Sequence, residues 1–200
     1  MKDGEGLWAE LVAEVGPAAV GRLKHYAELL EQWGRCHNLV RFKSRQDLVD
    51  RHLREAIALC RHMGEEGRLL DVGSGAGIPG VPILCVKRAW RGVLLEPRSK
   101  RWAFLKTAVR ELGLSAEAVR QRFEDYRGEF FDVITARAVG RHEDVLKWAT
   151  GKLNEGGFVA LWATEREETK LRSQVQWHVL SSPILGLKRG RLLRIQPSFT

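Results

Sequence analysis

The sequence has few cysteines and no long apolar run, and both absences exclude classes of protein. Its 200 residues contain three cysteines, Cys36, Cys60 and Cys85. An odd number at such wide spacing forms neither a disulfide framework nor a zinc site, so we expect no metal. No apolar stretch reaches the roughly 18 residues of a membrane-spanning helix. The first residues also lack the apolar segment of a secretory signal, so the expected location is the cytoplasm.

The positive charge is distributed unevenly along the chain. Residues 1–70 contain 11 basic and 11 acidic residues, whereas residues 71–200 contain 22 basic and 14 acidic residues. The second part therefore carries the whole net charge of +8. A basic region favours a polyanionic partner, of which nucleic acid is the common one, although a solvated surface rich in arginine has the same composition.

Two parts of the chain differ in hydrophobic periodicity. Over residues 7–62 apolar residues recur at helical spacing, which predicts an N-terminal helical cap over residues 1–64. Over residues 65–200 short apolar runs alternate with helical segments, which predicts a Rossmann-like α/β domain with a mostly parallel sheet. The expected strands are residues 68–72, 92–96, 118–121, 131–135, 158–162 and 191–195. The expected helices of this part are residues 81–87, 100–112, 145–150 and 165–175.

A glycine-rich segment follows the first expected strand and opens the next helix, as a nucleotide-binding loop does. The dinucleotide pattern G-x-G-x-x-G fails from Gly73, because its sixth position is Ile78, and fits only formally from Gly75. The better match is D-x-G-x-G-x-G, which is typical of class I S-adenosylmethionine-dependent methyltransferases. Asp71 is its acid, and a carboxylate there suits the ammonium of the methionine moiety but not a pyrophosphate. The expected cofactor-binding residues of this loop are Asp71, Gly73, Ser74, Gly75, Ala76 and Gly77; a nucleotide oxidoreductase and a structural turn are the alternatives.

A second acid supports the same interpretation. Glu96 ends the second expected strand, nineteen residues after Gly77. An acid at that position can accept hydrogen bonds from both ribose hydroxyls of a nucleoside. We therefore expect Glu96 and the adjacent Pro97 to contact the cofactor, with a surface carboxylate as the alternative for Glu96.

The sequence lacks the motifs of two acceptor classes. After the fourth expected strand, residues 134–138 read I-T-A-R-A, where methyltransferases of exocyclic amines often have Asn/Asp-Pro-Pro-Tyr. No Pro-Cys motif supplies the nucleophile of a pyrimidine C5 enzyme. Methylation of guanine N7 requires no general base, because the N7 lone pair is free in the neutral base and attacks the sulfonium methyl directly. Orientation and electrostatics would then suffice for catalysis, so the sequence permits N7 chemistry without singling it out.

Several motifs together resemble the glucose-inhibited division protein B family, bacterial methyltransferases that modify guanine N7 in 16S ribosomal RNA. The resemblance spans roughly residues 26–163. The matching segments are the loop with its Pro-Gly extension (71–80), K-R-W-A-F-L (100–105), R-F-E (122–124), A-R-A (136–138), N-L (38–39) and R-H (51–52). This combination is more specific than any glycine loop alone.

The resemblance implies a cofactor, a partner and a set of contacts. The cofactor is S-adenosyl-L-methionine, and the partner is ribosomal RNA or the small ribosomal subunit. We expect a monomer that binds neither a metal nor a membrane. The implied cofactor contacts are Gly73, Ile78, Phe123, Glu124 and Arg137. Arg137 is also the expected catalytic residue beside the substrate, with a helix-capping or surface arginine as the alternative.

Several positions depart from the family pattern. Val40 replaces a threonine, Glu55 and Ala56 replace Asp-Ser, Trp162 replaces the lysine of Leu-Lys-Gly, and Leu192 replaces the histidine of a C-terminal Arg-His. The cofactor half of the pattern is intact, whereas these positions belong to the presumed RNA side. A methyltransferase of the same fold with a small-molecule substrate is one alternative function. A cofactor-binding RNA-binding protein without turnover is the other.

Overall fold

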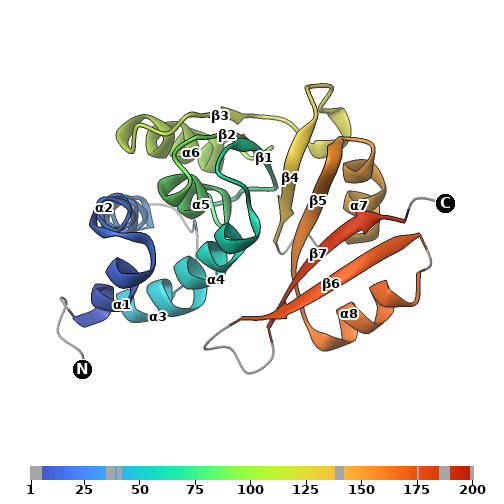
Figure 1. The fold of residues 1–200 in the computed structure, drawn as a ribbon. Helices are drawn as coiled ribbons and strands as arrows, with labels where there is room; N and C mark the ends of the chain where they lie inside the picture. The colour runs from blue at the N-terminus through green and yellow to red at the C-terminus, as the bar shows by residue number, and fades with distance from the viewer. Residues whose placement is uncertain are drawn as a thin grey trace.

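A seven-stranded sheet organises the part of the chain that the structure describes (Figure 1). The computed structural model describes residues 6–34, 39, 42–137, 142–174, 176–184 and 190–198. The strands are β1 (Gly67–Val72), β2 (Trp90–Leu95), β3 (Ala116–Val119), β4 (Phe131–Ala136), β5 (Leu153–Ala163), β6 (Trp177–Pro183) and β7 (Arg191–Pro197). Their order is β3-β2-β1-β4-β5-β7-β6; the first five are parallel neighbours, and β7 pairs antiparallel with β5 and β6. The mostly parallel, Rossmann-like sheet is thus confirmed, and its order reverses between β1 and β4, where such sheets bind ligands.

Helices cover both faces of this sheet. Leu69 and Leu70 are neighbours on β1, yet they belong to two different hydrophobic clusters because successive side chains of a strand point to opposite faces. One cluster packs against the N-terminal helices, α5 and α6, and the other against α7 and α8. The helices are α1 (Gly6–Val15), α2 (Pro17–Gly34), α3 (Arg45–Leu48), η1 (Val49–Leu53), α4 (Arg54–Ile57), η2 (Ala58–His62), α5 (Gly80–Val86), α6 (Ser99–Glu111), η3 (Phe123–Asp125), α7 (His142–Thr150) and α8 (Glu165–Arg172).

The N-terminal helices pack directly on the sheet domain. The buried face of α2 carries Leu23, Tyr26 and Leu30 at helical spacing. The ring of Phe104 on α6 lies 6.3 Å from the ring of Tyr26 and 5.5 Å from that of Trp33 (centroid distances). The helices and the sheet therefore share one continuous hydrophobic cluster. The division into domains at residue 64 stays a prediction.

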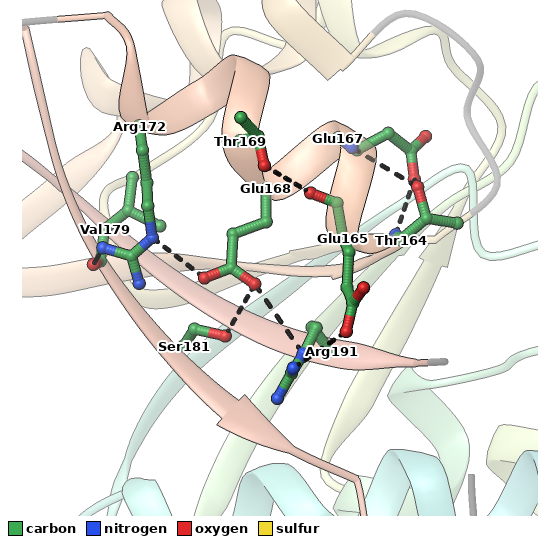
Figure 2. Close-up of polar contacts among 9 residues, drawn as sticks. All are labelled: Thr164, Glu165, Glu167, Glu168, Thr169, Arg172, Val179, Ser181 and Arg191. Carbon is green, nitrogen blue, oxygen red and sulfur yellow. Dashed lines mark hydrogen bonds and ion pairs between the residues drawn. The ribbon is translucent and has the colours of Figure 1, made fainter. Parts of the chain in front are cut away.

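The hairpin of β6 and β7 is fastened to α8 by a cluster of polar contacts (Figure 2). Thr164 is the N-cap of α8 and forms a capping box with Glu167. Glu168 accepts hydrogen bonds from Arg172 Nε at 2.9 Å and from Ser181 Oγ at 3.0 Å, and its Oε2 lies 3.9 Å from Arg191 Nε. One carboxylate thus connects α8 with both strands of the hairpin, as Figure 2 shows.

Two expected elements differ from the structure. The third strand was expected at residues 118–121, but β3 is Ala116–Val119, because Gln121 N donates to the carbonyl of Val119 and closes a turn. The helix expected at residues 165–175 ends at Arg172, and the following strand β6 was missed. This strand lies at the edge of the sheet, and its alternation is weak because several of its side chains are polar.

Candidate cofactor and acceptor site

The glycine loop joins β1 to α5 at the carboxyl ends of the parallel strands. Gly73, Gly75 and Gly77 have φ values of 67°, 58° and 91°, a region that side chains with a Cβ rarely adopt. Ser74 N donates to the carbonyl of Leu95 at 2.9 Å, which attaches the loop to the end of β2. The predicted loop therefore lies at the edge of the sheet where ligands of this fold bind.

Asp71 lies beneath this loop and is fully buried. Its Oδ2 accepts a hydrogen bond from Gly80 N at 3.2 Å, and its Oδ1 accepts one from Thr135 Oγ1 at 2.8 Å. Burial raises the pKa of Asp71 from 3.8 to about 6, although these hydrogen bonds act in the opposite direction. A Cβ on Gly80 would lie only 2.7 Å from Oδ2, so glycine is required there. The carboxyl group organises the loop, and its contact with a cofactor ammonium stays a prediction.

Glu96 directs its carboxylate at the same loop from the end of β2. Only 3% of the residue is exposed. Its Oε2 accepts a hydrogen bond from Gly75 N at 3.0 Å, and its Oε1 accepts one from Arg98 N at 2.8 Å. Pro97 follows, and its carbonyl accepts a hydrogen bond from Arg120 Nε at 3.5 Å, beyond the end of β3. The structure thus brings Glu96 and Pro97 to the loop edge, whereas their contact with ribose stays a prediction.

Phe123 and Glu124 lie in η3, just beyond β3. The ring of Phe123 is packed in the core and meets Trp148 edge to face, with 5.4 Å between centroids. The carbonyl of Glu124 accepts a hydrogen bond from Arg127 Nη1 at 2.6 Å. Both residues follow β3, which is parallel to β2. They therefore lie at the same edge of the sheet as Glu96, where the carboxyl ends of these strands meet. Their predicted contact with the cofactor is untested.

Tyr26 lies in the stretch predicted to be helical, and the structure brings it to the glycine loop. It is fully buried, and its hydroxyl donates a hydrogen bond of 2.5 Å to the carbonyl of Ala76 in the loop. Burial raises the pKa of Tyr26 well above its usual value, so the phenol stays protonated and remains a donor. Ile78, the last expected cofactor contact of the loop, packs against the hydrophobic cluster that contains Tyr26. A tyrosine on an apolar helix face was the available signal, since a buried hydroxyl needs a partner.

Arg137 follows β4 and forms a buried ion pair with Glu55. Its Nη2 donates to Glu55 Oε2 and also to the carbonyl of Arg51, the latter at 3.4 Å. Burial raises the pKa of Glu55 and lowers that of Arg137, while the charge of each partner opposes the shift in the other. Arg137 Nη1 is buried and has no hydrogen-bond partner within the described ranges. The expected catalytic residue is therefore held by contacts from the N-terminal helices.

Other expectations concern metals, thiols and membranes. Among the described residues, no group of His, Cys, Asp and Glu side chains could hold a metal ion. Burial raises the pKa of Cys60 and of Cys85 to about 12, so neither thiol is a nucleophile near neutral pH. No helix in the described part of the chain has the length and apolar composition needed to cross a membrane. Cys36 lies outside the described residues, and so does Val40, one of the departures from the family pattern.

Comparison with known families decides where the chain belongs. Residues 20–184 match the family model described as rRNA small subunit methyltransferase G (GidB). The chain belongs to this family. A relative named ribosomal RNA small subunit methyltransferase G, from Neisseria meningitidis serogroup A, is 33% identical over 156 residues, 78% of this chain and 74% of the relative. One of the same name from Laribacter hongkongensis is 38% identical over 137 residues, 68% of this chain and 66% of the relative. The expected family is thus confirmed.

Solved structures of other methyltransferases share the fold of this family member. The ribosomal protein L11 methylase of Lactobacillus delbrueckii subsp. bulgaricus matches with a TM-score of 0.61 and 17% identity. The match covers 79% of this chain and 81% of the methylase chain. Precorrin-6y C5,15-methyltransferase of Geobacter metallireducens matches with a TM-score of 0.59 and 12% identity, over 80% of this chain and 94% of the methyltransferase chain. At such identities the likeness concerns the fold alone.

Proposed function

We propose that the chain methylates guanine N7 in 16S ribosomal RNA, with S-adenosylmethionine as the methyl donor. Membership of the rRNA small subunit methyltransferase G family over residues 20–184 carries this proposal. The assignment of N7 as the acceptor atom rests on the family resemblance and on the absence of the motifs of other acceptor classes. The geometry of the glycine loop supports S-adenosylmethionine as the cofactor.

The side chains at the loop edge fit the charges of S-adenosylmethionine. Asp71 and Glu96 are buried carboxyl groups at the ends of adjacent strands, and Arg137 Nη1 is a buried donor without a partner in the described part. Acids suit the ammonium and the ribose hydroxyls, and the guanidinium suits a carboxylate or phosphate. When bound, the cofactor supplies a methyl group activated by the positive sulfur. The residues proposed to hold it are Asp71, Gly73, Ser74, Gly75, Ala76, Gly77, Ile78, Glu96, Pro97, Phe123, Glu124 and Arg137.

The protein then has to orient the reactants rather than move a proton. The N7 lone pair is free in neutral guanine, so the reaction needs no general base. Asp71 and Glu96 fix the loop through hydrogen bonds to Gly80 N and Gly75 N. We assign Arg137 the catalytic position, where it holds an oxyanion next to the reacting atoms. Orientation and preorganised charge are the two sources of rate that this arrangement offers.

The charge around the loop supports RNA as the acceptor. Residues 97–122 contain seven basic and two acidic residues, which is five of the eight net positive charges of the chain. Five of these basic residues, Arg98, Lys100, Arg101, Arg120 and Arg122, lie near the carboxyl ends of β2 and β3, on the side of the glycine loop. The far end of α6, with Arg110, lies toward the amino end of β2. Phosphate contacts from such residues make RNA affinity fall with salt, by a log–log slope of about −0.7 per phosphate for single strands. A small-molecule substrate would not show this dependence.

The proposed partner is ribosomal RNA or the small ribosomal subunit, bound by a monomer in the cytoplasm. Methyl transfer from tritium-labelled cofactor to bare 16S RNA and to small subunits tests the proposal, followed by mapping of the modified base. We expect label at one guanine N7 and at least a hundredfold loss in Arg137→Ala, in line with roughly 10²-fold effects of lost electrostatic contacts. Arg91→Ala, an exposed arginine near the amino end of β2, is the matched control.

The outcomes separate the alternatives. Label at another RNA position would contradict the N7 assignment. Cofactor binding without methyl transfer to bare 16S RNA or to small subunits would contradict the proposal. It would favour a cofactor-binding RNA-binding protein without turnover. Turnover of a small molecule at a rate insensitive to salt would favour the second alternative.

A further inference from the structure

Arg137 is held by residues from two segments that are distant in sequence. Glu55 on α4 pairs with its Nη2 across 82 positions. Trp162 on β5 donates its indole N–H to the backbone carbonyl of Glu55 at 3.1 Å, across 107 positions. The indole thus fixes the backbone of the residue whose carboxylate fixes the guanidinium. Trp162 and Glu55 are two of the departures from the family pattern, and the structure links them to the same arginine.

Both side chains of the ion pair are largely buried, so their desolvation opposes the formation of the pair. The side chains of Arg137 and Glu55 are only 19% and 8% exposed. Removing two charges from water costs several kcal/mol per ion in typical cases, and mutual attraction often fails to recover it. A buried ion pair is therefore weak evidence for stability, and the role left to test is that Glu55 orients the guanidinium. Nη1 has no partner among the described residues, whereas Nη2 is occupied twice.

We propose that Glu55 and Trp162 are positioning residues that hold Arg137 so that its Nη1 binds an oxyanion of the reactants. The oxyanion is the carboxylate of the cofactor or a phosphate of the RNA, and both bind a guanidinium through the same charge-assisted hydrogen bonds. This inference rests on the proposed function, because it needs the two reactants. It adds the residues through which this chain orients its catalytic arginine.

The test uses Glu55→Gln and Trp162→Phe in the full chain. Gln keeps an acceptor oxygen and loses the charge, and Phe keeps a ring and loses only the N–H donor. We expect each variant to lower affinity for one reactant by roughly three- to tenfold, the effect of one hydrogen bond or charged contact. Glu55→Asp, which restores the charge on a shorter side chain, should recover part of this loss. Trp90→Phe is the matched control, because Trp90 Nε1 donates to the carbonyl of Gly64 at 3.1 Å near the amino end of β2.

Two binding measurements identify the oxyanion without turnover. Weaker cofactor binding by calorimetry assigns it to the carboxylate. Weaker binding of 16S RNA on filters, with a salt slope smaller by about 0.7, assigns it to a phosphate. In either case, adding Glu55→Gln to Arg137→Ala should cause no further loss, because the two residues act as one unit.

Two results would overturn the proposal. One is unchanged affinity for both reactants in Glu55→Gln and Trp162→Phe, with any loss of thermal stability equal to that of Trp90→Phe. The other is a full additive loss in the double variant. Failure of the proposed function would show differently, as absence of methyl transfer in the wild type, and the binding measurements would still judge the positioning role.

Discussion

Asp71→Asn tests whether burial controls the charge beneath the cofactor loop. In the folded protein the pKa of Asp71 is raised from 3.8 to about 6. Between these values the folded state keeps the proton that the unfolded state has lost. The free energy of unfolding therefore falls as the pH rises from about 4 to about 6, and a shift of about two units corresponds to about 3 kcal/mol. The asparagine variant lacks this titration. The difference in the free energy of unfolding between wild type and Asp71→Asn should therefore change by about 3 kcal/mol over this pH range.

The variant should fold, because its amide can keep both contacts. One oxygen can accept from Gly80 N, and the amino group can face Thr135 Oγ1, whose proton has the carbonyl of Leu70 as a second acceptor at 3.3 Å. Urea unfolding of both proteins at several pH values between about 4 and 8 measures the difference. Thr135→Val removes a hydrogen bond that lowers the pKa of Asp71 and should move the transition to higher pH. Parallel pH dependence of wild type and Asp71→Asn would refute the reasoning.

Further predictions concern the loop and its support. Tyr26→Phe leaves the carbonyl of Ala76 without its donor, so we expect a loss of about 1–3 kcal/mol in urea unfolding and weaker cofactor binding in calorimetry; no change in either would contradict the role of the hydroxyl. Gly75→Val places a β-branched side chain at a φ of 58° and should abolish cofactor binding, whereas unchanged affinity would refute the loop assignment. Gly80→Ala puts a Cβ 2.6 Å from Leu94 Cδ2 and should lower the free energy of unfolding by about 1–3 kcal/mol; an unchanged urea midpoint would show that the strand relaxes.

Local patterns in the sequence predicted the sheet and the loop well. Parallel strands buried on both faces are continuous apolar runs, and Asp71 and Glu96 stand at the ends of two of them, so their meeting at one edge follows from the fold. The edge strand β6 was missed because an edge with polar side chains carries little of this signal. Its position depends on β7 and on contacts with α8, which lie outside any short window.

Contacts between distant segments were the part that the sequence did not reveal. Tyr26 and Ala76 are 50 positions apart, and Glu55 and Arg137 are 82 apart. Each pair depends on how the N-terminal helices dock on the sheet, and hydrophobic periodicity shows which face docks but not which polar atoms meet. The sequence marks Glu55 only as a departure from the family pattern. Its ion pair with Arg137 emerged from the tertiary structure.

The hydrogen bond between Tyr26 and Ala76 links occupancy of the loop to the folding of α2. A ligand that binds only the ordered loop stabilises everything that must be folded for the loop to be ordered, by about 2.7 kcal/mol at roughly a hundred times the Kd. Backbone amides of α2 should then exchange with deuterium more slowly when the ligand is present, although the helix contributes no expected contact to it. The cellular concentration of the cofactor would in this way set how often the N-terminal helices open and become accessible to proteases.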